Sequence, residues 1–83
     1  MLTNYIHHVM RHAHFEIMET GRFYGSIPGF QGVWSEGATL EECRDELIDV
    51  LESWLVVTLR GGKDVPVVDG INITHTDKEV AYA

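Results

Sequence analysis

The chain has 83 residues, of which 45% are hydrophobic and 23% are charged, and these values are typical of a single folded globular domain. A domain of this size removes only about 60% of its unfolded surface from water, so association with another chain would add stability. Six basic and thirteen acidic side chains give a formal net charge of −7. This charge repels nucleic-acid phosphates and attracts basic partners, so direct binding to DNA or RNA is not expected.

The sequence also predicts where the protein is found. It shows no basic leader followed by an apolar run, and no stretch approaches the roughly twenty apolar residues of a membrane span. The single cysteine, Cys43, cannot form an internal disulfide, and we expect it to be a buried apolar group; a reactive thiol or an inter-subunit bridge is the alternative. We therefore expect one domain, residues 1–83, in the cytoplasm and away from membranes.

The first third of the chain predicts a helix and a hairpin. Apolar residues recur with helical spacing over residues 2–13, so an N-terminal helix is expected within residues 1–13. Alternating apolar residues then predict strands at 14–19 and 22–27. Thr20-Gly21 joins them as a hairpin, because glycine can adopt the positive φ of a tight turn.

The next segment predicts a third strand and the start of a long helix. Pro28-Gly29 ends the second strand, and a third strand is expected at 33–36, which gives an antiparallel meander. A capping box then begins the helix: the Thr39 hydroxyl can accept a hydrogen bond from the amide of Glu42, while the Glu42 carboxylate can accept one from the amide of Thr39.

The long helix continues with one apolar face to Leu59, where Gly61-Gly62 supplies a left-handed end. Residues 71–74 are β-prone and predict a short fourth strand, and residues 75–83 predict a frayed tail. The predicted fold is therefore α+β, with an N-terminal helix, a three-stranded antiparallel meander, a long helix and a short fourth strand.

The last turns of the long helix carry apolar groups on nearly all sides, which one small sheet cannot cover. Either the N-terminal helix or a second subunit must cover the rest. We expect a homo-oligomer, a dimer or a tetramer, although both tryptophans, Trp34 included, suit a core as well as an interface. The predicted oligomer interface consists of Trp54, Val56, Val57 and Leu59.

Two histidines form the candidate metal site of the sequence. His8 and His12 lie four residues apart, a spacing that allows two imidazoles on a helix to share a metal ion. However, Val9 stands where the HExxH motif has glutamate, and no nearby carboxylate or cysteine completes a third ligand by sequence. We expect no metal site and exposed histidines; the alternative is a metal-dependent hydrolase that also uses carboxylates of the sheet.

Acidic residues line the outer side of the long helix, which predicts either a solvated face or a docking strip for a basic protein. The serines lack an adjacent base and acid, and the glycines do not match a phosphate-binding loop. We therefore predict no catalytic residue, no cofactor and no enzyme activity. The predicted partner-binding residues are Glu36, Glu41, Asp45, Asp49 and Glu52.

The central part of the chain resembles the HicB-like antitoxin family. The resemblance rests on FYGSIPGFQGVWSEG at residues 23–37, TLEEC at 39–43 and the helix ending LESWL at 51–55. It implies a partial RNase H-like fold without the catalytic carboxylates of the nuclease. Its implied partner is a HicA-like toxin, a small basic protein that cleaves mRNA. Many family members also carry a C-terminal DNA-binding domain, for which the residues after Thr74 are too few.

Two functions follow from these observations. The first is an antitoxin-type protein that binds and masks a small basic HicA-like toxin. The alternative is a stand-alone oligomeric scaffold or small-ligand-binding module with no toxin partner. Both are binding functions, and in both the surface of the domain determines what is bound.

Overall fold

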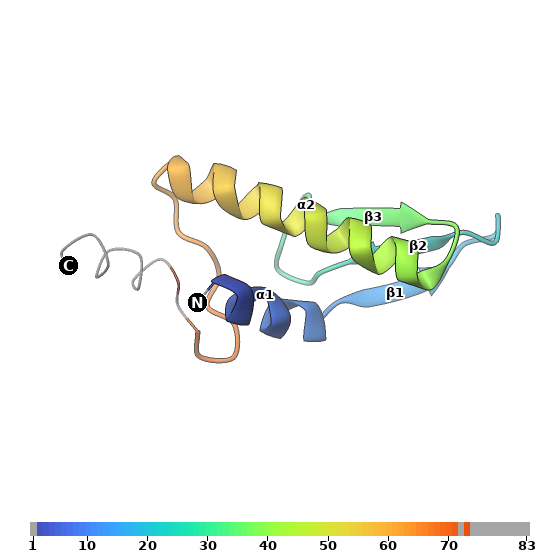
Figure 1. Ribbon diagram of the computed structural model, residues 1–83, viewed down its shortest axis with the longest axis horizontal. Coiled ribbons are helices and arrows are strands. Elements are labelled where there is room, and N and C mark those ends of the chain that lie inside the picture. Colours follow the sequence, from blue (N-terminus) through green and yellow to red (C-terminus); the bar gives the residue numbers. More distant parts are fainter. Residues whose placement is uncertain (1, 72, 74–83) are drawn as a thin grey trace.

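The computed structural model describes residues 2–71 and 73. The strands form one antiparallel sheet in the order β1-β2-β3. Helix α2 packs across one face of this sheet, and helix α1 lies beside α2 (Figure 1). The predicted α+β meander with two helices is confirmed. The elements are α1 (Leu2–Arg11), β1 (His14–Ile17), β2 (Phe23–Ser26), β3 (Trp34–Gly37) and α2 (Leu40–Arg60).

The predicted hairpin between β1 and β2 is present. The amide of Met18 donates to the carbonyl of Arg22 at 2.8 Å, and the amide of Gly21 donates to the carbonyl of Met18 at 2.9 Å. Gly21 has a φ of 85°, which is the left-handed conformation that a three-residue hairpin loop needs near its end. This turn fixes the register in which Ile17 lies opposite Phe23.

Two consecutive turns join β2 to β3. The amide of Phe30 donates to the carbonyl of Ile27 at 3.1 Å, and the amide of Val33 donates to the carbonyl of Phe30 at 3.2 Å. Gly29 and Gly32 hold the third positions of these turns with φ of 84° and 87°, as type II turns require. The three apolar residues at which the turns begin and end are all buried in the core, and β3 begins one residue later than predicted.

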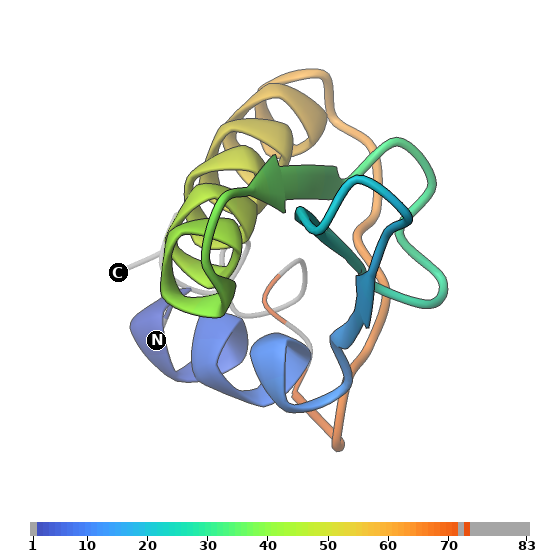
Figure 2. The same ribbon diagram turned by 90° about the vertical axis from the view of Figure 1, so that its right-hand side faces the viewer.

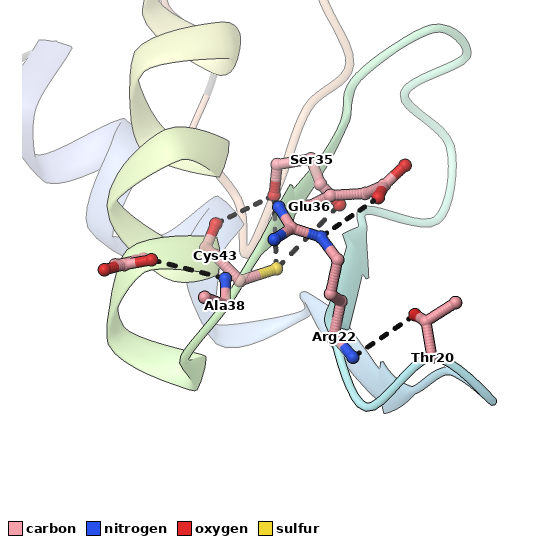
Figure 3. A network of polar contacts seen from close by, with 7 residues as sticks. Thr20, Arg22, Ser35, Glu36, Ala38 and Cys43 are labelled. Atoms are coloured by element: carbon pink, nitrogen blue, oxygen red, sulfur yellow. Dashed lines mark hydrogen bonds and ion pairs between the residues drawn. The ribbon is translucent and has the colours of Figure 1, made fainter.

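The predicted cap of α2 is present with one difference. Thr39 Oγ1 accepts a hydrogen bond from the amide of Glu42 at 3.1 Å. The Glu42 carboxylate, however, accepts from the amide of Ala38 at 3.2 Å, whereas the sequence predicted the amide of Thr39 (Figure 3). At the other end, Gly61 remains right-handed with a φ of −76°, and Gly62 supplies the left-handed residue with a φ of 74°.

Two glycines allow α2 to approach the sheet closely. A Cβ atom on Gly37 would lie 2.5 Å from the backbone nitrogen of Cys43, and one on Gly25 would lie 3.2 Å from its thiol. The hydroxyl of Ser35 donates to the carbonyl of Cys43 at 2.8 Å (Figure 3). Cys43 is fully buried, so it packs between helix and sheet as predicted, and burial keeps the thiol from solvent.

After α2 the chain returns beside α1 (Figure 1). The hydroxyl of Tyr5 donates to the carbonyl of Pro66 at 2.6 Å, and burial raises the pKa of Tyr5 to about 12. Val65 and Ile73 are each 5% exposed and pack into the core. The returning segment therefore closes the end of the core that the short sheet cannot reach, as the end-on view indicates (Figure 2).

The structure differs from the prediction at the fourth strand. Ile71 forms an isolated antiparallel bridge with Val68 across a turn in which Asp69 and Gly70 have φ of 50° and 80°. This turn folds Ile71 back onto its own neighbour, so it does not extend the sheet. Ile73 is helical, while residues 72 and 74 and the predicted tail at 75–83 lie outside the described residues.

The core lies between the two helices, the sheet and the returning segment. Within the described residues, neither helix is long and apolar enough to cross a bilayer. The buried side chains come from both helices, from the turns between β2 and β3 and from the returning segment, and Phe15 of β1 is partly buried against them. They are Tyr5, Ile6, Val9, Met10, Ile27, Phe30, Val33, Leu47, Leu51, Leu55, Val65 and Ile73.

The close approach of α2 can be tested by adding one methyl group. Gly37→Ala would bring its Cβ against the helix backbone at Cys43, so the helix must shift. We expect the free energy of unfolding to fall by about 1–3 kcal/mol, measured by urea unfolding. Gly61→Ala is the matched control, because its nearest atom is 3.4 Å away and its φ suits alanine; it should be neutral or slightly stabilising. Equal midpoints for the two variants would contradict the close packing.

Candidate protein-binding surface

The predicted acidic residues of α2 lie along one exposed stripe, which we call the α2 stripe. Their spacing of three or four residues places them on neighbouring turns of one helix face. The buried residues of the same helix follow the opposite side, beginning at Cys43 and ending at Leu55. The stripe therefore points away from the core. Its exposed members are Glu41, Asp45, Asp49 and Glu52.

Glu36, the fifth predicted contact residue, lies on a different surface. Along β3, Ser35 and Gly37 are buried whereas Trp34 and Glu36 are exposed. Because successive side chains of a strand point to opposite faces, Glu36 lies on the sheet face turned away from α2. Its carboxylate oxygen is 3.7 Å from Nε of Arg22 (Figure 3). The structure thus divides the five predicted residues between two surfaces.

The same face of the sheet carries a pair of aromatic side chains. The rings of Tyr24 and Trp34 stack with centroids 6.1 Å apart and planes at 24°. Tyr24 lies opposite Glu16 on one neighbouring strand and opposite Glu36 on the other. Trp34 is 50% exposed. We call these four residues the open sheet face, which combines two aromatic rings with carboxylates on both sides.

Tyr24 was not among the contact residues predicted from the sequence, and Trp34 suited a core as well as an interface. The signal was present in the strand pattern, because Tyr24 is out of phase with Phe23 and Gly25, the residues on the helix side. The stacking itself required the register of β2 against β3, in which Ser26 lies opposite Trp34. Diagonal neighbours of this kind are within reach of aromatic side chains.

The residues of the predicted oligomer interface do not form one exposed patch. Trp54 packs against Phe30 edge to face, with centroids 5.2 Å apart and planes at 64°, and Leu59 is partly buried against the core. Val56 and Val57 remain 44% and 71% exposed. The fold itself partly covers two of the four side chains, so the two valines are the most exposed members of the predicted interface.

His8 and His12 meet a carboxylate that the sequence did not place near them. Nδ1 of His8 is 2.9 Å from Oδ2 of Asp69, and Nε2 of His12 is 2.9 Å from Oδ1. Hydrogen bonds from the two imidazoles hold the pKa of Asp69 below its usual value. Over residues 2–71 and 73, no group of three or more histidine, cysteine or acidic side chains is placed to hold a metal ion. The three residues instead fasten the returning segment to α1.

The architecture defines a class of small α+β domain, a three-stranded antiparallel meander with one helix across its inner face. The chain belongs to the UPF0150-like family, whose model matches residues 4–66. This family is of the HicB-like, antitoxin type. At the level of the type of family, the match agrees with the resemblance that residues 23–55 show.

A solved structure shares the same fold. The crystal structure of TTHA0281 from Thermus thermophilus superposes with a TM-score of 0.81 at 35% sequence identity, covering 86% of this chain and 89% of that chain. Comparison with curated proteins gave no match.

The contact between Asp69 and the two histidines predicts a pH dependence of stability. A carboxylate whose pKa is lowered on folding contributes stability above its unfolded pKa of about 4, and this contribution is lost as the pH falls through the lowered value. Asp69→Asn should therefore be less stable than the wild type near neutral pH, and the difference should shrink below about pH 4. Thermal unfolding at a series of pH values measures it.

The matched control is Asp64→Asn. Asp64 is an exposed carboxylate in the same returning segment, and it makes no hydrogen bond or ion pair to the residues that the structure describes. Its variant should follow the wild type at every pH. A constant difference between Asp69→Asn and wild type from acid to neutral pH would show that the carboxylate charge is not what stabilises this contact.

Proposed function

We propose that this protein is an antitoxin-type binding protein that masks a small basic partner, a HicA-like mRNA-cleaving toxin. The observation that carries the proposal is the open sheet face, where Tyr24 lies between Glu16 and Glu36 and its ring stacks on that of Trp34. Exposed tryptophan and tyrosine are the side chains that most often dominate binding energy at protein interfaces. Carboxylates beside them favour arginine and lysine on the partner.

The two acidic surfaces have different roles in this proposal. The open sheet face provides aromatic area that a partner can bury. Among the described residues, the exposed aromatic side chain is Trp34 on the sheet and not on the α2 stripe, so the carboxylates of the stripe act mainly at a distance. Long-range attraction raises the association rate, whereas buried contacts determine how slowly the complex separates. With a net charge of −7, the domain attracts a basic protein before contact is made.

The mechanism is occlusion. A small RNA-cleaving protein needs an exposed basic surface to hold the phosphates of its substrate. An acidic and aromatic face that covers this surface prevents RNA from binding, and no bond needs to be made or broken by the antitoxin. The proposal therefore assigns binding to this chain and assigns no catalytic residue, metal or cofactor.

The sheet face can be tested with a small basic protein encoded next to this one, purified as a catalytically inactive variant. Trp34→Ala and Tyr24→Ala should each weaken the complex about tenfold or more through a faster dissociation rate. Asp45→Asn and Asp49→Asn together should mainly slow association, and this effect should diminish as salt is added. Surface plasmon resonance separates the two rates.

Val57→Ala is the matched control, because it also truncates an exposed apolar side chain but on α2. It should leave both rates unchanged. The absence of any complex at low salt would count against the toxin-masking function and favour the stand-alone scaffold or ligand-binding module. A complex that forms normally with Trp34→Ala would retain the function but remove the open sheet face as its contact surface.

A further inference from the structure

An open groove of about 390 Å³ lies between α1 and α2, away from the open sheet face. Its floor is apolar and includes Ile6, Met10 and the half-buried Ile48. Charged side chains stand at its ends. The residues that line it are Thr3, Ile6, His7, Met10, Arg11, Arg44, Ile48 and Glu52.

The groove has a positive end and a negative end. Helices α1 and α2 run in opposite directions (Figure 1), so the C-terminal end of α1 lies beside the N-terminal part of α2. Arg11 and Arg44 are therefore at one end, while Thr3 and Glu52 are at the other. The apolar floor lies between them. Along α2, Arg44 and Glu52 are each four residues from Ile48, in opposite directions.

Neither arginine forms an ion pair with the residues that the structure describes. The ion pairs among the described residues join His8 and His12 to Asp69 and Arg22 to Glu36. Arg11 and Arg44 take part in none of them, although the chain has thirteen acidic side chains. Within residues 2–71 and 73, this positive end has no ion-pair partner, so it can pair with a carboxylate from outside.

We propose that this groove is the interface of a homodimer, in which α2 packs antiparallel against α2 of a second copy about a two-fold axis near Ile48. A two-fold axis brings a surface against itself, so the surface must be self-complementary. The pattern of arginine, isoleucine and glutamate at intervals of four meets this condition. Arg44 faces Glu52 of the second copy, Glu52 faces its Arg44, and the isoleucines meet at the centre.

Charge complementarity is what selects a second copy as the occupant. Two copies that each carry a charge of −7 repel one another over most of their surfaces, so they associate best where opposite charges meet. A small anionic ligand suits the groove less well, because ligand pockets bury most of the ligand surface and this groove is only partly enclosed. The facing helix of another copy can cover both ends and the floor together.

A charge exchange tests the arrangement. Arg44→Glu and Glu52→Arg should each weaken dimerisation about tenfold or more, because each places like charges opposite one another. The double variant Arg44→Glu/Glu52→Arg should restore a dimer close to wild-type affinity. Two turns of helix separate these positions by about 12 Å, so they cannot pair within one copy and the rescue must come from the second. Sedimentation velocity over a range of concentrations measures the dissociation constants.

Glu46→Arg is the matched control. It makes the same charge change on the same helix, but Glu46 is exposed on another side of α2, where it lines a separate groove with Val50 of the same helix and Trp34 of β3, so the dimer should be unaffected. A wild-type protein that is monomeric at all concentrations would overturn the proposal. So would single variants that dimerise normally, or a double variant that is folded by circular dichroism yet not rescued. None of these outcomes bears on binding of a basic partner to the open sheet face.

Discussion

The close contact between Gly37 and Cys43 is the constraint on which the arrangement of this domain depends. Without a Cβ at Gly37, the backbone of the first turn of α2 can lie directly against β3, and the buried hydroxyl of Ser35 ties the two together at 2.8 Å. The helix therefore covers the inner face of the sheet. Of the two faces of the sheet, only the outer one then remains exposed, and Trp34 stays exposed there because no core residue is needed on that side.

Most of the fold could be predicted because its signals are local. Alternating apolar residues indicate strands, glycine at position 21 indicates the hairpin, and Thr39 with Glu42 indicates the helix start. The fourth strand was not predictable in the same way. A β-prone segment such as the one at Ile71 can extend a sheet or fold back on its neighbour, and the choice is made by the two positive φ values at Asp69 and Gly70. Aspartate can adopt a positive φ, but its presence in a sequence does not predict that conformation.

The candidate surfaces were less predictable because they join distant segments. The sequence could place carboxylates on α2 but grouped Glu36 with them, and only the alternation of β3 shows that Glu36 belongs to another face. The stack of Tyr24 on Trp34 depends on strand register. Asp69 is 61 residues from His8, so no spacing rule could connect them. The ring that packs on Trp54 likewise comes from a distant turn.

The distribution of charge distinguishes the open sheet face from the groove between the helices, while Glu52 belongs both to the α2 stripe and to the groove. Carboxylates occupy the α2 stripe and flank the aromatic rings of the open sheet face, whereas Arg11 and Arg44 stand at one end of the groove between the helices. A basic partner is therefore repelled from that end and attracted to the sheet. A second copy, which is acidic, is attracted to the same end and repelled from the sheet face. The open sheet face favours a basic partner, and the positive end of the groove favours an acidic one. Because these surfaces lie on opposite sides of the domain, the two proposed contacts can form at once without competing.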